Sequence, residues 1–286
     1  MSDDTISWRA MLAETAQVVA DRTAALWLCQ RASGYDADEF IGELDNPVTS
    51  RAASHLHDMV RRFLAGEPLQ YVLGRWAFRR LDIMVDSRVL IPRPETEMLV
   101  DLVIAEVMPR SGSTIVDMGT GSGAIGLAIL DELPIGHATV WMTDVSDDAL
   151  DVARANVAGL GRPAVGARLS QGAWYDALPQ ELESSVDVIV ANPPYVKDDD
   201  PDLEANVREW EPPLALFAGP DGLREIDSIV RGARRWLAPG ALLLVEFGSR
   251  QGDAVRSLAH DAGLVEVDVI CDAAGLDRVL WARAPR

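Results

Sequence analysis

Cysteine is scarce in this sequence, and several other features are absent altogether. The 286 residues include only two cysteines, Cys29 and Cys271, which lie far apart and show no metal-type spacing. A disulfide framework is therefore not expected, and a reducing cytosol is the natural compartment. No apolar run approaches the roughly 18 residues of a transmembrane helix. The N-terminal Met1–Asp4 is acidic and lacks the apolar region of a signal peptide, which argues against a leader. These absences predict a cytoplasmic protein without a membrane partner.

Positive charge is also in short supply. The chain has 45 acidic and 26 basic residues, a net charge of -19, and Lys197 is its only lysine. Residues 1–80 hold 11 acids and 9 bases, whereas the remainder holds 34 acids and 17 bases. Such a surface repels a phosphate backbone, so no direct nucleic-acid partner is expected, although a local basic groove would be compatible with it. A solvated acidic surface that reports on no partner explains the charge more simply.

Apolar spacing divides the chain into three parts. Helical periodicity begins after Ser7, a suitable N-cap, and predicts a small helical bundle over residues 1–70. Short β-like runs at Tyr71–Leu73 and Leu81–Val85 predict a β-hairpin linker over residues 71–94. Prolines restrict the chain at the end of this linker, and a helix is expected over residues 95–107. Residues 95–286 then form the third part.

Strand and helix patterns alternate from Thr114 onward. This alternation over about 170 residues predicts an α/β fold with a parallel, doubly wound (Rossmann-like) sheet. A short connection between the last two strands predicts that the final strand is antiparallel. Helices are expected between most strands, for example over residues 125–131, 147–157 and 226–237. The seven expected strands are 114–118, 138–143, 166–169, 186–191, 241–247, 265–270 and 278–281.

The first of these strands runs into a glycine-rich turn. Glycines let the backbone pass close beneath a ligand, and the helix that follows offers free N–H groups. The G-x-G-x-x-G spacing alone would suggest a dinucleotide. However, a carboxylate beside the turn would repel a pyrophosphate and attract a sulfonium. The turn therefore predicts S-adenosylmethionine as cofactor. The residues are Asp117, Gly119, Thr120, Gly121, Ser122 and Gly123.

The next strand ends in Asp144, roughly 25 residues further on. An acid at this position can accept hydrogen bonds from both ribose hydroxyls of a nucleoside. A single acid at the end of a strand is weak evidence for a nucleoside site, but together with the glycine turn the evidence is stronger.

A third strand runs directly into Asn192-Pro193-Pro194-Tyr195. Proline has no N–H, so carbonyl groups of this loop point outward unpaired, and Asn192 adds a side-chain carbonyl. Tyr195 adds a flat aromatic face. Together these groups can accept both N–H bonds of a planar amide or amine and aim its nitrogen at a methyl donor, which is catalysis by positioning and electrostatics.

Other candidate sites are weaker. The four histidines have no metal-binding partner at ligand spacing, so no metal site is expected. The acidic run Asp198–Asp200 is most simply a solvated loop. No nucleophile arrangement of the Ser or Cys type is visible.

The motifs together carry a resemblance to a known family. The sequence resembles the bacterial release factor glutamine methyltransferases, which methylate N5 of the glutamine in the GGQ motif of class I peptide chain release factors. The resemblance covers nearly the whole chain, and the order of an I-P-R-P-x-T-E segment and N-P-P-Y is its most specific part. The matching segments are 67–74, 90–97, 117–123, 192–195, 209–212, 215–217, 222–223 and 246–248, with Gln251.

The resemblance implies roles for the two larger parts and for single residues. The N-terminal domain would engage the release factor, and a seven-stranded C-terminal domain would bind S-adenosylmethionine. Gly119–Gly123 would lie under the methionine part, Asp144 on the ribose and Trp174 beside the adenine. Asn192 and Pro193 would hold the glutamine amide, with Pro194 and Tyr195 nearby. Arg93, within Ile91–Pro94, would border the pocket, and we expect the protein to act as a monomer.

Two departures and two alternatives accompany this interpretation. Ala173 stands where the family often has an acid before the tryptophan, which weakens the expected contact to the adenine amino group. Ala241 replaces the second glycine of a frequent Gly-Gly, a tolerable turn variant. An adenine-N6 nucleic-acid methyltransferase would use the same N-P-P-Y chemistry, but the chain shows no region of clustered bases to recognise a target. A non-catalytic scaffold would be free to lose Asn192.

Overall fold

The computed structural model describes residues 6–286, so Met1–Asp4 lie outside the described residues. Contacts within the chain separate two compact units, which meet between Arg75 and Trp76. None of the helices in the described part is long and apolar enough to cross a membrane.

The N-terminal unit consists of helices, as predicted. Ser7 caps the first helix by accepting a hydrogen bond from the Ala10 N–H, which confirms the expected start. The helices are α1 (Trp8–Val19), α2 (Arg22–Ser33), α3 (Ala37–Gly42), α4 (Ser50–Leu64) and α5 (Leu69–Leu73).

One prediction for this unit is wrong. Tyr71–Leu73, expected as a strand, belong to the short helix α5. Pro68 precedes the helix, and Gly74 ends it with a left-handed φ of 71°. All three residues of the run are buried. A continuous apolar run of three residues carries no periodicity, so it cannot distinguish a strand from a fully buried turn of helix.

A β-hairpin opens the C-terminal unit. Its strands are β1 (Arg75–Phe78) and β2 (Leu81–Met84), so the run predicted to begin at Leu81 is indeed a strand. Arg79, at the turn, forms ion pairs with Glu132 at 2.8 Å and with Asp101 at 2.7 Å. These pairs attach the hairpin to two helices of the same unit.

The main sheet of the C-terminal unit has seven strands, as predicted. Their order is β5-β4-β3-β6-β7-β9-β8. Neighbouring strands are parallel except that β9 runs antiparallel to both β7 and β8, which confirms the antiparallel final strand. The strands are β3 (Ser113–Met118), β4 (Ala138–Asp144), β5 (Ala167–Gln171), β6 (Val186–Ala191), β7 (Leu237–Glu246), β8 (Val265–Cys271) and β9 (Asp277–Arg283).

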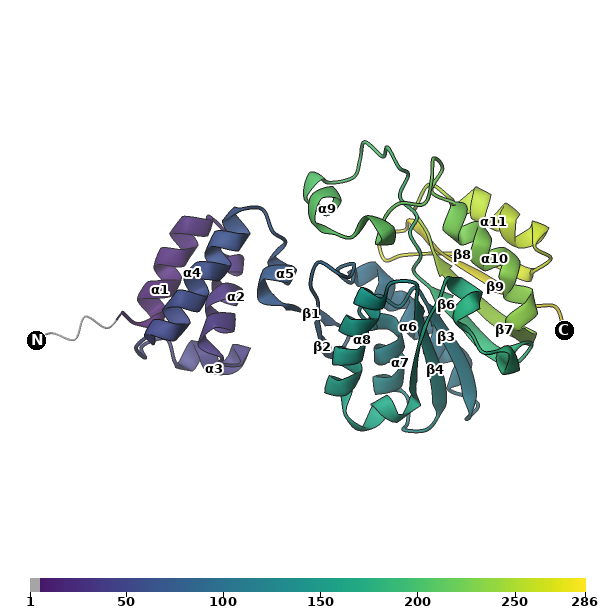
Figure 1. Cartoon of the computed structure of the whole chain (residues 1–286), viewed down its shortest axis with the longest axis horizontal. Coiled ribbons are helices and arrows are strands. Elements are labelled where there is room, and N and C mark those ends of the chain that lie inside the picture. Colours follow the sequence, from purple (N-terminus) through teal and green to yellow (C-terminus); the bar gives the residue numbers. More distant parts are fainter. Residues whose placement is uncertain (1–5) are drawn as a thin grey trace, which may run out of the picture. The chain divides into compact units, whose positions relative to one another are not determined.

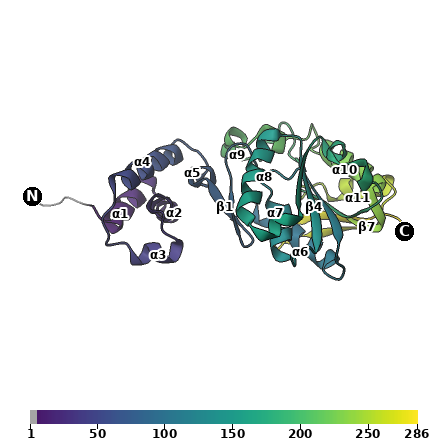
Figure 2. The ribbon, with the colours of Figure 1, turned by 60° about the horizontal axis from the view of Figure 1, so that its bottom comes forward.

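Helices accompany the sheet in two groups (Figure 1). One group packs α6 against α7 and α7 against α8, and the other packs α10 against α11. Figure 2 shows β4 between α7 and the pair α10 and α11. The bounds are α6 (Glu97–Val107), α7 (Ala124–Glu132), α8 (Asp147–Leu160), α9 (Ala205–Trp210), α10 (Arg224–Trp236) and α11 (Gly252–Asp261).

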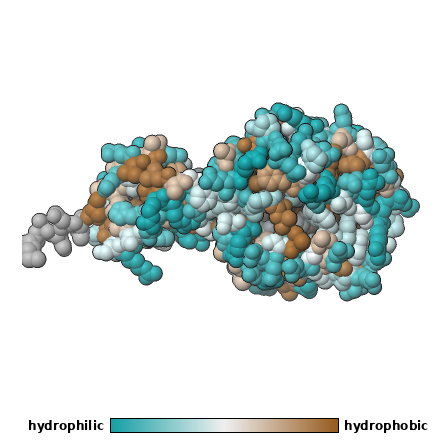
Figure 3. Space-filling model, turned by 45° about the horizontal axis from the view of Figure 1, so that its top comes forward, coloured by the Kyte–Doolittle hydropathy of each residue, from teal (hydrophilic) through white to brown (hydrophobic). Residues whose placement is uncertain are grey.

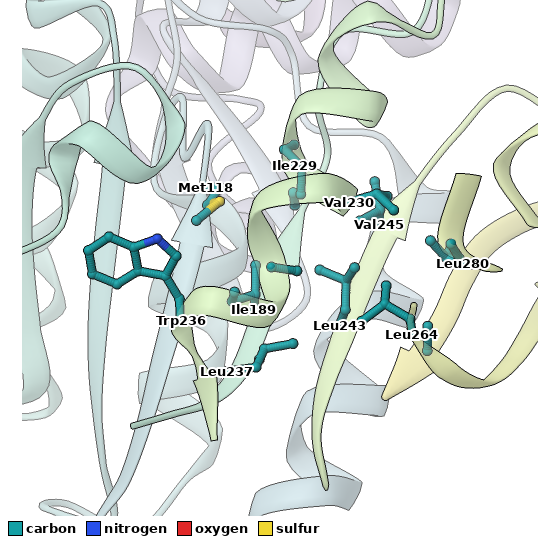
Figure 4. Packing of buried hydrophobic residues seen from close by; sticks show 14 of the residues in the cluster. Met118, Ile189, Ile229, Val230, Trp236, Leu237, Leu243, Val245, Leu264 and Leu280 are labelled. Atoms are coloured by element: carbon teal, nitrogen blue, oxygen red, sulfur yellow. The ribbon is translucent and has the colours of Figure 1, made fainter. Parts of the chain in front are cut away.

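The core explains why the central strands are almost continuously apolar. Residues of β3, β6, β7 and β9 pack against α10 and α11 in one buried cluster, part of which Figure 4 shows around Ile189, Leu243 and Ile229. Strands covered on both faces need apolar side chains in every position. The chain passes from β3 outward to β4 but from β6 outward to β7, so the strand order reverses between β3 and β6. Open α/β sheets bind ligands at the carboxyl ends of strands at such a reversal.

Candidate active site

A cavity of about 330 Å³ opens at this reversal. The loops after β3, β4, β5 and β6 supply one part of its wall. Residues 88–96, residues 212–217 and the start of α10 supply the rest. The residues predicted to bind cofactor or substrate that line it are Gly119, Thr120, Gly121, Ser122, Asp144, Trp174, Asn192 and Pro194. Five other residues that were predicted for the site do not line the cavity: Asp117, Gly123, Arg93, Pro193 and Tyr195.

The glycine turn adopts the backbone conformation that its sequence predicts. Gly119, Gly121 and Gly123 have φ values of 68°, 55° and 88°, a region that costs little only for glycine. A Cβ added at Gly121 would meet no atom within 4 Å, and Gly121 lines the cavity. The backbone of this turn is therefore open to a ligand.

Asp117 lies beneath this turn and is fully buried. Its Oδ2 accepts hydrogen bonds from the Thr120 hydroxyl at 2.6 Å and from the Gly126 N–H at 3.0 Å. Its Oδ1 has no partner among the described residues. Burial raises the pKa of this carboxyl to about 6. Asp117 thus holds the turn and the first turn of α7 in place, and its charge acts from behind the turn.

Asp144, unlike Asp117, lines the cavity. Its Oδ2 accepts from the Gly121 N–H and its Oδ1 from the Ser146 N–H, both at 2.9 Å. Burial raises the pKa of Asp144, while these backbone N–H groups oppose the rise. Each carboxylate oxygen has a second lone pair, so the fixed carboxylate can still accept hydrogen bonds from a ligand.

Trp174 provides a flat wall beside the glycine turn. A Cβ at Gly119 would lie 3.4 Å from the indole ring, so a glycine lets the turn approach the ring closely. The indole N–H donates to Glu225 at 2.9 Å. Ala173 and Glu225 also line the cavity.

The Asn192–Tyr195 loop follows β6 and divides its residues between the cavity and the interior. Asn192 lines the cavity, and its Nδ2 donates to the Thr96 Oγ1 at 3.1 Å. Pro193 is buried. The Tyr195 hydroxyl donates to the Glu246 Oε1 at 3.4 Å, and the Tyr195 carbonyl accepts from the Gln251 Nε2 at 3.2 Å. The loop is therefore held from the protein side by three side chains.

The sequence predicts no role for Glu246 or Thr96, although both belong to segments that resemble the family. Glu246 is fully buried at the end of β7, and its Oε2 has no partner within the described part of the chain. Burial raises the pKa of its carboxyl to about 7. The signal that could have revealed it is an acid at the end of an apolar strand, the same pattern that identified Asp144.

Arg93, expected to border the pocket, forms an ion pair with Glu211. The other oxygen of the buried Glu211 accepts from the Ile91 N–H at 3.0 Å. Since residues 88–92 and 212–217 form two parts of the cavity wall, this ion pair joins them.

Comparisons with known proteins agree with this geometry. The family "Methyltransferase small domain" matches residues 96–208, and "PrmC N-terminal domain" matches residues 6–74. A methyltransferase structure from Pyrococcus furiosus superimposes with a TM-score of 0.53 at 16% identity, covering 80% of this chain and 99% of that one. A ribosomal protein L11 methylase structure from Lactobacillus delbrueckii gives 0.50 at 18% identity, covering 71% and 86%. The fold is that of a methyltransferase.

Curated relatives define the family more narrowly. A release factor glutamine methyltransferase from Xylella fastidiosa is 42% identical over 84% of this chain and 85% of its own length. One from Burkholderia pseudomallei is 37% identical over 93% of both chains. One from Cereibacter sphaeroides is 37% identical over 97% of both. This chain belongs to the release factor glutamine methyltransferase family and is an S-adenosylmethionine-dependent enzyme.

Proposed function

We propose that this protein methylates the side-chain amide nitrogen (N5) of the glutamine in the GGQ motif of class I peptide chain release factors. The observation that carries the proposal is the position of Asn192, which lines the same cavity as the glycine turn and Asp144. An amide-binding loop and a nucleoside-binding edge thereby share one pocket, in a chain of this family.

The cavity fits S-adenosylmethionine, which supplies an electrophilic methyl group when bound. The open backbone of Gly119, Thr120, Gly121 and Ser122 would accommodate the methionine part, and the Asp144 carboxylate would accept from the ribose hydroxyls. Trp174 would lie beside the adenine. Asp117 and Gly123 contribute from beneath, by holding the turn in its conformation.

The chain's own groups would act on the glutamine amide by positioning it. A carboxamide nitrogen is a poor nucleophile because its lone pair is delocalised. Carbonyl acceptors at Asn192 and Pro193 would take both N–H bonds and favour a pyramidal nitrogen whose lone pair faces the methyl donor. Pro194 and Tyr195 shape the loop, and Arg93 fixes the neighbouring wall through Glu211. The extra proton leaves the nitrogen after transfer, so no strong base is needed beforehand.

We further propose that the N-terminal domain, residues 1–70, docks the release factor. Large apolar side chains are exposed on this unit: Val18, Trp27, Ile41 and Leu64. Figure 3 shows apolar side chains gathered on the face of the unit that is turned to the viewer. Exposed apolar patches commonly mark surfaces that bind another protein. Residues 71–94 would then serve as the linker and 95–286 as the catalytic domain.

The remaining parts of the proposal concern the setting of the reaction. The substrate is a translation factor, and translation takes place in the cytoplasm, so we place the protein there. The net charge of -19 supports the absence of a direct nucleic-acid partner. We also propose that the protein acts as a monomer.

Mass spectrometry of a purified class I release factor tests the proposal. The factor is incubated with this protein and S-adenosylmethionine, with unmethylated DNA as a parallel acceptor. We expect one added methyl on the peptide that carries the GGQ glutamine, and none when that glutamine is replaced by alanine. Transfer to adenine instead would favour an adenine-N6 methyltransferase, and transfer to neither acceptor would overturn the proposed activity.

A further inference from the structure

Glu225 is an acid of the cavity wall to which the proposed mechanism gives no role. Among the described residues that line the cavity, the acids are Asp144 and Glu225. Asp144 is matched to the ribose hydroxyls of the cofactor. Glu225 lies in the first turn of α10, and its side chain is 20% exposed. An ionised carboxylate can only accept hydrogen bonds, so a ligand that binds Glu225 must bring a donor.

The strand order places Glu225 at one end of the cavity. The parallel strands β5, β4, β3 and β6 are neighbours in that order. The loops at their carboxyl ends contribute Trp174, Asp144, the glycine turn and Asn192 to the cavity wall. A cofactor with its ribose at Asp144 and its methyl group toward Asn192 would therefore have its base at the loop after β5. Glu225 contacts this loop, because its Oε2 accepts from the Trp174 indole N–H at 2.9 Å.

The hydrogen-bonding groups of adenine fit an acid at this position. The amino group of the base is a donor, whereas its unsubstituted ring nitrogens are acceptors. The Glu225 Oε2 accepts from Trp174, and its Oε1 accepts from the Arg224 Nε at 2.7 Å. Each of these oxygens has a second lone pair. Ala173, the residue before Trp174, also lines the cavity, but its methyl group cannot accept a hydrogen bond. Glu225 can therefore bind an amino group that the side chain of Ala173 cannot.

We propose that Glu225 recognises the adenine of the cofactor by accepting a hydrogen bond from its amino group. This inference rests on the proposed function for the position of the cofactor in the cavity. The same carboxylate holds the Trp174 ring through the indole N–H. One side chain thus fixes the flat wall beside the base and selects the group at the edge of the base.

Two ligands that differ only in this amino group test the proposal. S-adenosylhomocysteine carries the adenine, and its 6-deamino analogue carries a hydrogen atom in place of the amino group. Their Kd values are measured by calorimetry with the full chain and without a release factor, so the readout requires no methyl transfer. We expect the wild-type protein to bind S-adenosylhomocysteine roughly 10-fold to 100-fold more tightly than the analogue, as for one hydrogen bond to a charged group.

Three variants separate recognition of the base from support of Trp174. Glu225→Ala removes the acceptor, and the ratio of the two Kd values should fall to within about 2-fold of one. Trp174→Phe removes the indole N–H but keeps an aromatic wall, so it should weaken both ligands by the same factor. Asp227→Ala removes the other acid of the same helix turn, which does not line the cavity. It controls for the effect of helix charge and should keep the wild-type ratio.

The outcomes that would overturn the proposal are distinct from a failure of the proposed function. A wild-type ratio near one would overturn it without any variant. A ratio in Glu225→Ala within about 2-fold of the wild-type ratio would show that Glu225 acts only through Trp174. Equal losses of the ratio in Glu225→Ala and Asp227→Ala would assign the effect to helix charge, which also overturns the proposal. If the ratio depends on Glu225 but the release factor receives no methyl group, the recognition of adenine stands and the proposed function alone is refuted.

Discussion

Glu246→Gln should make the stability of the C-terminal unit less sensitive to pH. Burial raises the pKa of the Glu246 carboxyl from 4.5 to about 7, against the opposing effects of Thr96 and Arg278. Because the folded pKa lies above the unfolded one, the folded state binds more protons between these two values. The stability of the folded state therefore falls as the pH rises through this window. The difference corresponds to about 3 kcal/mol of unfolding free energy.

Glutamine resembles the neutral form of this side chain at every pH, so the variant should lack this loss. The melting temperature of the variant minus that of wild type should therefore increase between pH 4.5 and pH 8. With about 2 to 4 °C per kcal/mol for a domain of this size, the expected increase is roughly 6 to 12 °C. Other groups, such as Asp117 with its raised pKa, titrate equally in both proteins and cancel in the difference.

Thermal unfolding measured across this pH range is the assay, and hydrogen exchange of peptides from 237–246 assigns the transition to the C-terminal unit. Glu181→Gln, at an exposed position, is the control and should give a difference that does not change with pH. If the difference in melting temperature between Glu246→Gln and wild type stays constant from pH 4.5 to pH 8, Glu246 is not a buried acid with a raised pKa, and the reasoning fails.

Three further predictions concern the cavity and the two units. Asn192→Ala should lower kcat by about 100-fold or more, since it removes a group that acts on the transition state, yet leave the calorimetric Kd for S-adenosylmethionine nearly unchanged; near wild-type turnover would disprove the mechanism. Deletion of residues 1–74 should impair methylation of the intact release factor far more than cofactor binding, and equal activity of the truncated protein would remove the docking role. Gly126→Ala should destabilise the protein by about 1 to 3 kcal/mol in denaturant titrations, because its Cβ would lie 2.8 Å from the Met142 Cγ and 3.0 Å from the Asp117 Oδ2; unchanged stability would mean that the Met142 and Asp117 side chains move aside at no cost.

Much of the fold follows from the sequence because parallel strands buried on both faces leave a clear pattern. All seven strands of the main sheet were predicted, because the central ones are apolar runs bounded by turn residues, and the more exposed β5 and β8 fit the alternation of strands and helices along the chain. Tyr71–Leu73 was assigned wrongly because so short a run has no measurable period. The helix over Ala37–Gly42 was not predicted, since its six residues span fewer than two turns.

The candidate site divides in the same way. A glycine turn and an acid at the end of a strand are both recognisable from a few neighbouring residues in the sequence. Most of the cofactor residues predicted in this way line the cavity. The contact of Asn192 with Thr96 joins positions 96 residues apart, and no local pattern encodes it. The same holds for the ion pair of Arg93 with Glu211, whose partners lie 118 positions apart.

The position of β9 within the main sheet has a consequence for how the chain folds during synthesis. β9 lies between β7 and β8 and pairs with both, although it follows both in the chain. While the ribosome is still making residues 277–283, β8 has no strand to pair with, and the outer edge of β7 stays uncovered. Uncovered strand edges favour association with other chains. A nascent chain paused before Asp277 should therefore be prone to aggregation, whereas completion of this one strand closes two ladders at once.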